Sequence, residues 1–258
     1  VFHIREDNID ESSFERDTTG GRIRFGYSFS EYLRQSWAYT LRMDDVRPAS
    51  DASQFIKDDS GRSVTSSISH TLSYDSRDNR FSPNDGYVLS TTNEIAGLGG
   101  SKRFLRNRVS AGIYYSVAPD YVLSVLGQAG HIIGLGQDVD VNERFNLGGD
   151  NFRGFETAGI GPRDLEADDA LGGNVFGVGT VEMSFPLPLP DEYALRGRLF
   201  AEAGTLFGLD RDDLPGVADD TSLRATIGVG ASWDSPFGPI RVDLGYPVLK
   251  EPYDRTQI

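Results

Sequence analysis

The feature that most constrains the fold of this chain is an alternation of apolar and polar residues that recurs along its length. In the segment 21–30, Ile23, Phe25, Tyr27 and Phe29 alternate with arginine, glycine and serine residues. The pattern recurs in the segments 33–43, 64–74, 104–117, 121–135, 174–185, 195–207, 223–233 and 240–248, and more weakly in 87–98. Because successive side chains of a strand point to opposite faces, each segment is predicted to be a β-strand with one apolar face.

The predicted strands are longer than those of a typical soluble sheet. Several run for about ten residues or more, which matches a tilted strand that crosses a bilayer. Their polar faces carry mid-strand arginines such as Arg24, Arg42 and Arg108, too many for the dry core of a soluble β-sandwich or propeller. A short turn at 30–32 is followed by the long polar connection Val46–Arg62, an asymmetry typical of outer-membrane barrels. We therefore predict an all-β chain that forms a transmembrane antiparallel β-barrel of the outer-membrane type.

The number of predicted strands is odd, about eleven, whereas single-chain bacterial barrels have an even number. An open edge in lipid would leave backbone N–H and C=O groups without partners. The first residues, VFHIRED, begin within a stretch that is itself typical of a strand, and the polar tail Leu249–Ile258 stops where a further strand is expected. We expect strands upstream of Val1 and downstream of Ile258, so that the chain 1–258 is a partial barrel.

Composition argues against several classes of function. A net charge of −14 disfavours non-specific binding to nucleic acid. The chain has no cysteine, and its three histidines lack metal-ligand spacing, so no metal site is expected. No nucleophile–base pair or phosphate-binding loop stands out, so we expect neither enzyme activity nor a bound cofactor. The acidic pairs Asp168-Asp169 and Asp219-Asp220 are expected to be solvated. The sequence contains no run of about 18 apolar residues, so no transmembrane helix is expected.

One long segment, Arg144–Gly173, interrupts the alternation. It is rich in glycine and aspartate, and at roughly 30 residues it far exceeds the usual length of a connection. Long ordered loops are often functional. Within this loop Arg153 lies between Phe152 and Gly154-Phe155. A guanidinium that is folded inward needs a carboxylate partner, whereas one on a solvated surface loop does not.

The strands after the loop offer two partners for Arg153. Alternation places Glu182 and Glu202 on the polar, inward faces of adjacent predicted strands. If the loop folds into the lumen, Arg153 can pair with one or both glutamates in a partly desolvated site. The alternative is that both glutamates line a wet lumen and Arg153 remains in solvent.

These motifs resemble those of a known family. Phe152-Arg153-Gly154-Phe155 is similar to the arginine-glycine-phenylalanine signature in the sixth extracellular loop of the BamA-type outer-membrane β-barrel assembly factors. Further matches, weak singly but specific together, are Asp75-Ser76-Arg77-Asp78 with Phe81 and Pro83–Gly86, Gly148-Gly149, Gly159–Asp164, Leu171–Asn174, Leu199–Gly204, and Ser235–Pro239 with Ile240–Tyr246. The resemblance covers nearly the whole chain.

The resemblance implies a barrel of about 16 strands that folds and inserts other barrel proteins into the bacterial outer membrane. The chain would correspond to about the fifth to the fifteenth strand, with residues 136–173 as an inward-folded extracellular loop and without the periplasmic POTRA domains. It implies that Arg153 anchors the loop on Glu182 and Glu202, with Gly148, Gly149, Gly161 and Pro162 supporting it. The family usually has aspartate where Glu202 stands, which places the pairing geometry in question.

The implied partners are unfolded outer-membrane β-barrel substrates, accessory assembly lipoproteins, the lipid bilayer and lipopolysaccharide. Two other functions stay open. One is a sister translocation factor, of the autotransporter-assembly or two-partner secretion type. The other is a passive outer-membrane channel or receptor barrel. Gly159–Asp164 and the turn Pro186–Pro190 favour the assembly factor.

Overall fold

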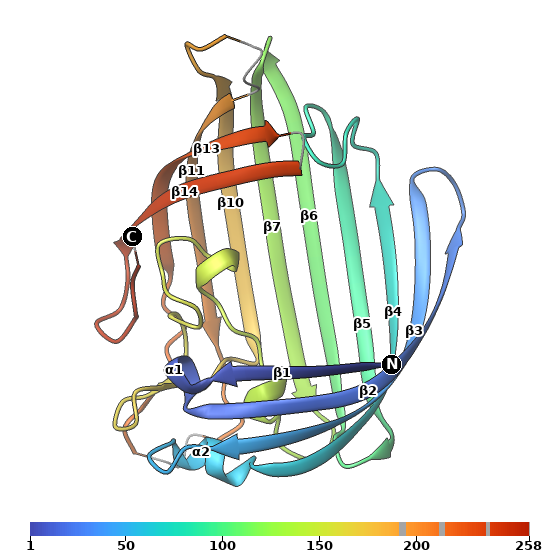
Figure 1. The fold of residues 1–258 in the computed structure, drawn as a ribbon, viewed down its shortest axis with the longest axis vertical. Coiled ribbons are helices and arrows are strands. Elements are labelled where there is room, and N and C mark those ends of the chain that lie inside the picture. Colours follow the sequence, from blue (N-terminus) through green and yellow to red (C-terminus); the bar gives the residue numbers. More distant parts are fainter. Residues whose placement is uncertain (191–194, 212–214, 236–237, 258) are drawn as a thin grey trace.

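A computed structural model describes residues 1–190, 195–211, 215–235 and 238–257. Its main element is a single antiparallel sheet of 11 strands, curved into a trough (Figure 1). The strands are β1 Phe2–Asn8, β2 Phe14–Ser28, β3 Leu33–Pro48, β4 Gly61–Asp75, β5 Gly86–Gly100, β6 Phe104–Ala118, β7 Tyr121–Gly134, β10 Val175–Pro186, β11 Leu195–Phe207, β13 Arg224–Ser235 and β14 Gly238–Leu249. Every strand pairs with its neighbour in the sequence, and β7 pairs with β10 across the long loop.

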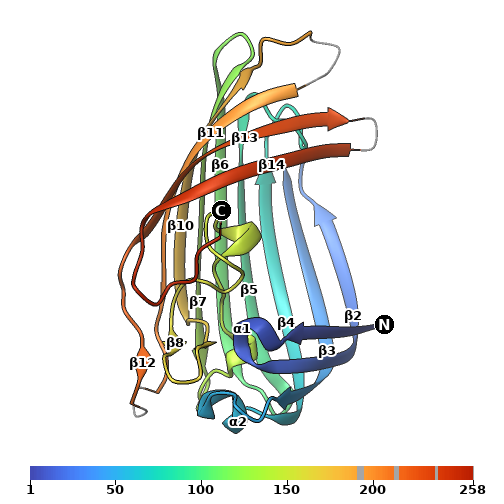
Figure 2. The ribbon, with the colours of Figure 1, turned by 60° about the vertical axis from the view of Figure 1, so that its left-hand side comes forward.

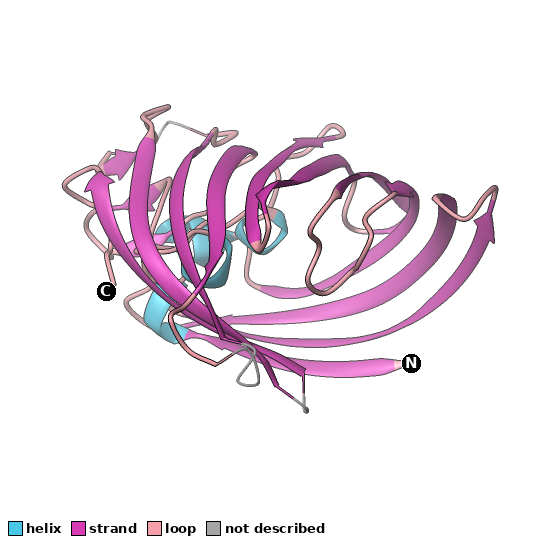
Figure 3. Cartoon of the chain, turned by 90° about the horizontal axis from the view of Figure 1, so that it is seen from above, coloured by secondary structure: helices cyan, strands magenta, loops and turns pink. Residues whose placement is uncertain are grey.

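The predicted faces of the strands are confirmed. The residues expected to point outward are largely exposed on the convex side, including Phe25 at 74%, Ile113 at 59% and Val242 at 64%. Their polar neighbours point into the trough, whose concave side holds the helices and the long loop (Figure 3). A large apolar outer surface of this kind is expected of strands that face lipid.

Three strands extend further than the alternation predicts. The expected connection Val46–Arg62 is shorter in the structure, because β3 continues to Pro48 and β4 begins at Gly61. Similarly, β2 begins at Phe14 rather than near Gly21. Phe14 is paired with Pro48 and buried, and Val46 packs into the same apolar cluster. This packing stabilises strand ends that the polar composition alone would assign to a loop.

Short helices, 3-10 turns and a small second sheet accompany the main sheet. They are α1 Ile9–Ser12, α2 Gln54–Asp58, the 3-10 turns η1 Val141–Glu143 and η2 Gly149–Asn151, and a small sheet of β12 Val217–Ala218, β8 Arg163–Asp164 and β9 Asp169–Ala170. No helix in the described ranges is long and apolar enough to cross a membrane. The predicted turn Ser235–Pro239 falls partly on Pro236 and Phe237, which lie outside the described residues.

The strands β1 and β14 form the two edges of the sheet, and they are not paired with each other in the part of the chain that the structure describes. The long loop and the segment after β14 lie between these edges on the concave side (Figure 2).

Candidate functional site

The long loop between β7 and β10 is seated on an apolar cluster inside the trough. Phe152 and Phe155, which flank the loop arginine, are 0% and 1% exposed and pack edge to face with their ring centroids 5.4 Å apart. Other members of the cluster come from the loop and from the sheet, among them Phe145, Leu147, Ile160, Phe104, Ile132, Phe176 and Leu206. The loop therefore contributes many of the side chains of the apolar cluster on which it packs. This burial excludes the alternative of a solvated surface loop.

Backbone geometry explains the glycines that precede the arginine. Gly148 has a φ of 127°, and a Cβ on it would lie 1.9 Å from the carbonyl oxygen of Glu156. The Gly149 N–H donates to the Phe155 carbonyl at 2.9 Å, which closes a tight turn around the signature. Further along, Gly161 lies against the side chain of Leu206, and the buried Pro162 accepts a hydrogen bond from Leu171 N–H at 2.9 Å. The predicted support residues thus all lie in the folded part of the loop.

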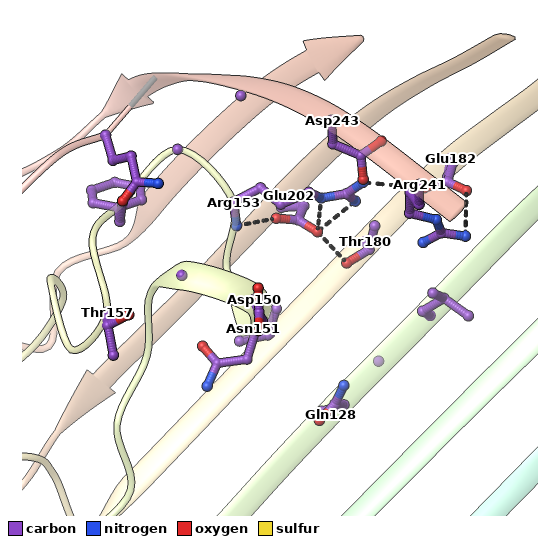
Figure 4. Close-up of a pocket in the computed structure, with 18 residues that line it drawn as sticks. Gln128, Asp150, Asn151, Arg153, Thr157, Thr180, Glu182, Glu202, Arg241 and Asp243 are labelled. Atoms are coloured by element: carbon purple, nitrogen blue, oxygen red, sulfur yellow. Dashed lines mark hydrogen bonds and ion pairs between the residues drawn. The ribbon is translucent and has the colours of Figure 1, made fainter. Parts of the chain in front are cut away.

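Arg153 points from this turn into the wall of the trough, where Glu202 of β11 is its main partner (Figure 4). The guanidinium donates to Glu202 Oε1 from Nη2 at 2.6 Å and from Nε at 3.0 Å. The backbone N–H of Arg153 donates to Glu202 Oε2 at 2.9 Å. One carboxylate therefore holds both the side chain and the backbone of the loop arginine.

Two further carboxylates complete the partners of Arg153. Its Nη1 donates to Asp243 Oδ2 at 2.8 Å and to Glu182 Oε2 at 3.3 Å. Arg198 of β11, whose side chain is 2% exposed, also binds both acids, with Nε donating to Glu182 Oε1 at 2.8 Å and Nη1 to Asp243 Oδ1 at 3.1 Å. We call these five residues, Arg153, Glu182, Arg198, Glu202 and Asp243, the arginine cluster.

The register of the sheet places these side chains together. Glu182, Phe200 and Gly228 are directly opposite one another on β10, β11 and β13, and Arg198, Gly230 and Asp243 form the neighbouring row on β11, β13 and β14. The two glycines leave the space that the row needs, since a Cβ on Gly228 would lie 2.2 Å from the Phe200 ring and one on Gly230 would lie 1.9 Å from Asp243 Oδ1. The guanidinium carbon of Arg153 lies 3.4 Å from the centroid of the Phe200 ring, close enough for a cation–π interaction.

The cluster is shielded but not sealed. The side chain of Arg153 is 17% exposed, and those of Glu182, Glu202 and Asp243 are 9%, 8% and 11% exposed. Burial opposes the charge on Arg153, but the hydrogen bonds and charges of Glu202 and Asp243 outweigh it and raise the pKa of the guanidinium. A cavity of about 650 Å³ borders the cluster and is lined by Gln128, Asp150 and Arg241, among others.

The structure brings Arg153 together with both glutamates that strand alternation pointed to, and it adds two residues. Asp243 and Arg198 were not singled out, although alternation places both side chains inward. Glu202 reaches the backbone as well as the guanidinium, so its longer side chain, where the family usually has aspartate, is accommodated in this loop.

The second half of the loop also binds Ser53, the residue that precedes α2. Asp169, expected to be solvated, is only 2% exposed and accepts a hydrogen bond from the backbone of Ser53 at 2.7 Å. Asp219 accepts hydrogen bonds from the backbone of Gly208 and Leu209, both at 2.8 Å. Within the described ranges, no group of three or more His, Asp or Glu side chains could hold a metal ion.

Comparison with known proteins assigns the chain to a family. The family model described as the Omp85 superfamily domain matches residues 1–258. An outer membrane protein assembly factor BamA from Neorickettsia risticii is 38% identical over 260 residues, which cover 100% of this chain and 35% of that protein. The BamA of Nitratidesulfovibrio vulgaris is 30% identical over 240 residues, 91% of this chain and 30% of that protein. The chain thus spans about a third of the length of these curated relatives.

Solved structures show the same fold. The crystal structure of BamA from Haemophilus ducreyi lacking POTRA domains 1-3 superimposes with a TM-score of 0.86 at 19% identity, covering 99% of this chain and 56% of that chain. The fold prediction and the family resemblance indicated by the sequence motifs are both confirmed.

Proposed function

Because the chain belongs to the Omp85 superfamily, we propose that it is the membrane-embedded part of a bacterial outer-membrane assembly factor, not an enzyme. Such a factor folds β-barrel proteins and inserts them into the outer membrane, where this chain would be an integral component. The observation that carries the proposal is the loop arginine bound to three wall carboxylates, Glu182, Glu202 and Asp243. Relatives named as assembly factors match along this chain, which supports the same reading.

The arginine cluster would fix the loop inside the barrel. Removing Arg153 leaves Arg198 bound to Glu182 and Asp243, but it removes the described ion-pair partner of Glu202. Removing one partner of a buried ion pair costs about 3–5 kcal/mol, and the partial exposure of Arg153 places its loss near the lower value. A loop fixed at this strength is a structural part of the machine. It also occupies part of the concave side of the sheet (Figure 1).

The chain would form about the fifth to the fifteenth strand of a barrel of about 16 strands, with residues 136–173 as the extracellular loop. The match of 99% of this chain to 56% of a BamA structure that lacks POTRA domains 1-3 supports this assignment. The proposed partners are unfolded outer-membrane β-barrel substrates, accessory assembly lipoproteins, the lipid bilayer and lipopolysaccharide. Neither a cofactor nor ATP has a part in the proposed mechanism.

The test uses the full-length protein in liposomes and follows the folding rate of an unfolded barrel substrate. We expect the wild-type protein to accelerate folding over empty liposomes, and Arg153→Ala to reduce this acceleration while the barrel stays folded. Arg34→Ala is a matched control, since Arg34 is exposed and makes no described ion pair. A protein that gives steady ion conductance and no acceleration would instead be a channel.

A further inference from the structure

The segment after β14, residues 250–257, folds back along the loop signature. The Arg255 N–H donates to the Gly159 carbonyl at 3.0 Å, and the Glu156 N–H donates to the Arg255 carbonyl at 3.1 Å. Next to these bonds, the Gln257 N–H donates to the Gly154 carbonyl at 3.2 Å, and Thr256 forms a bridge with Phe155. This tail segment therefore pairs with the residues that directly follow Arg153.

The tail segment is attached to the sheet by a fully buried ion pair. Arg224 of β13 and Asp254 are both 0% exposed, with Arg224 Nε 3.0 Å from Asp254 Oδ2 and Nη2 3.1 Å from Oδ1. Asp254 Oδ2 also accepts the N–H of Glu251 at 2.7 Å, and the Tyr253 hydroxyl accepts Arg224 Nη2 at 3.1 Å. A two-point contact between desolvated charges fixes orientation as well as distance.

A second contact ties the tail segment to the opposite edge of the sheet. Arg255 donates from Nη2 to the Asp168 carboxylate at 2.7 Å and from Nη1 to the carbonyl of Asp10 in α1 at 2.9 Å. The structure thus joins the loop, the segment after one edge strand and the helix beside the other edge at one residue. Arg255 is partly exposed, and exposed pairs contribute little, so the buried pair is the stronger anchor.

The tail segment adds hydrogen bonds to a stretch whose ordering is costly. Glycines precede and follow Arg153, and glycine loses more conformational freedom on folding than any other residue. The hydrogen bonds of Arg153 are directional, so a small displacement of the loop breaks several of them together. The wall carboxylates fix the end of the side chain, whereas the tail segment fixes the backbone from which it starts.

We propose that residues 250–257 are a positioning element for Arg153, and that the Arg224–Asp254 pair anchors this element to the sheet. The inference rests on the proposed function, because it assigns the element to the loop arginine of the assembly factor. Neither Arg224 nor Asp254 touches the arginine cluster in the described contacts, so both act through the backbone of the loop.

The position of the loop can be measured without reference to activity. The chain has no cysteine, so spin labels on Asp150→Cys and Gln128→Cys report the distance between the loop and β7 in the full-length protein. Both residues line the cavity beside the cluster, and neither side chain makes a described hydrogen bond (Figure 4). The variants are Asp254→Asn, which leaves Arg224 without its charged partner, and Glu251→Gln, which makes the same charge change on the same segment without a described side-chain contact.

We expect a narrow distance distribution in the wild type and in Glu251→Gln. In Asp254→Asn a second, longer distance should appear, and the rate of substrate folding should fall toward that of Arg153→Ala. The conservative Asp254→Glu should recover part of both. A folded Asp254→Asn with the wild-type distance distribution would overturn the proposal.

If Asp254→Asn fails to fold, the double variant Arg224→Met, Asp254→Leu replaces the pair by apolar side chains and removes the unpaired charge. A displaced loop in that variant supports charge-specific positioning, and a wild-type loop overturns it.

The distance measurement and the folding rate also separate the positioning proposal from the proposed function. If Asp254→Asn moves the loop but Arg153→Ala leaves folding rates unchanged, the positioning stands and the proposed role of the arginine fails.

Discussion

The strongest quantitative prediction concerns Glu202, which binds three donors of Arg153. Replacing it by glutamine keeps the shape of the side chain but removes its charge. The glutamine oxygen can still accept the donors on one side of the former carboxylate, while its amide group faces at least one N–H group that it cannot bind. Arg153 retains Asp243 at 2.8 Å and Glu182 at 3.3 Å, so the guanidinium does not become unpaired.

The expected loss follows from these contacts. Hydrogen bonds to charged groups contribute about 1.5–3 kcal/mol each, and the retained acceptor offsets part of the loss. We therefore expect Glu202→Gln to destabilise the docked loop by about 2 kcal/mol, less than the 3–5 kcal/mol for a buried ion left without a partner. Since about 1.4 kcal/mol corresponds to a factor of ten, the open state of the loop should gain roughly 30-fold in population.

Amide hydrogen exchange measures this change. The amides of Arg153 and Gly154 should exchange roughly 30-fold faster in Glu202→Gln, because local opening sets their exchange. Amides in β5 and β6, far from the cluster, should be unaffected. Glu156→Gln is the matched control, since the Glu156 side chain makes no described contact. Unchanged exchange at Arg153 and Gly154 would refute the reasoning that Glu202 holds the loop.

Two further predictions concern the loop and its surroundings. Burial, and after it the charge of Asp140, raises the pKa of Asp59 to about 6. Because the folded state then holds a proton that the unfolded state releases, the free energy of unfolding falls as the pH rises from about 4 through 6. Asp59→Asn should therefore be more stable than the wild type by about 3 kcal/mol at neutral pH and equally stable below about pH 4, as measured by denaturant unfolding in detergent at both pH values. A pH-independent difference would contradict the assignment. Gly148→Ala should destabilise the folded loop by about 1–3 kcal/mol, because the φ of Gly148 is 127° and the new Cβ would overlap the Glu156 carbonyl oxygen. Faster hydrogen exchange at the Gly149 amide would report this destabilisation. Wild-type exchange there would show that the turn tolerates a side chain.

Strand alternation was sufficient to predict the faces of the sheet and the inward direction of Glu182 and Glu202. Alternation depends on one strand at a time, and both strands alternate between buried and exposed residues around Glu182 and Glu202. It could also point Arg153 toward acids, because a buried guanidinium needs a partner.

The rest of the cluster depends on register between strands, which one-strand periodicity does not contain. Asp243 reaches Arg198 across β13 only because Gly230 lies between them in the same row. The tail segment has no periodicity, and Tyr253-Asp254-Arg255 in sequence is typical of a solvated end. Its burial follows from the position of Arg224, which the sequence does not locate relative to Asp254.

The central claim is that the pairing of Arg153 with the wall supports assembly, and charge reversal tests it most directly. In the full-length protein in liposomes, we would compare substrate folding rates for Arg153→Glu, Glu202→Arg and the double variant. The account predicts that each single variant loses acceleration, because each places like charges against the remaining residues of the cluster, and that the double variant recovers part of it. Wild-type rates in the single variants, or no recovery in the double variant while both proteins stay folded, would contradict the account.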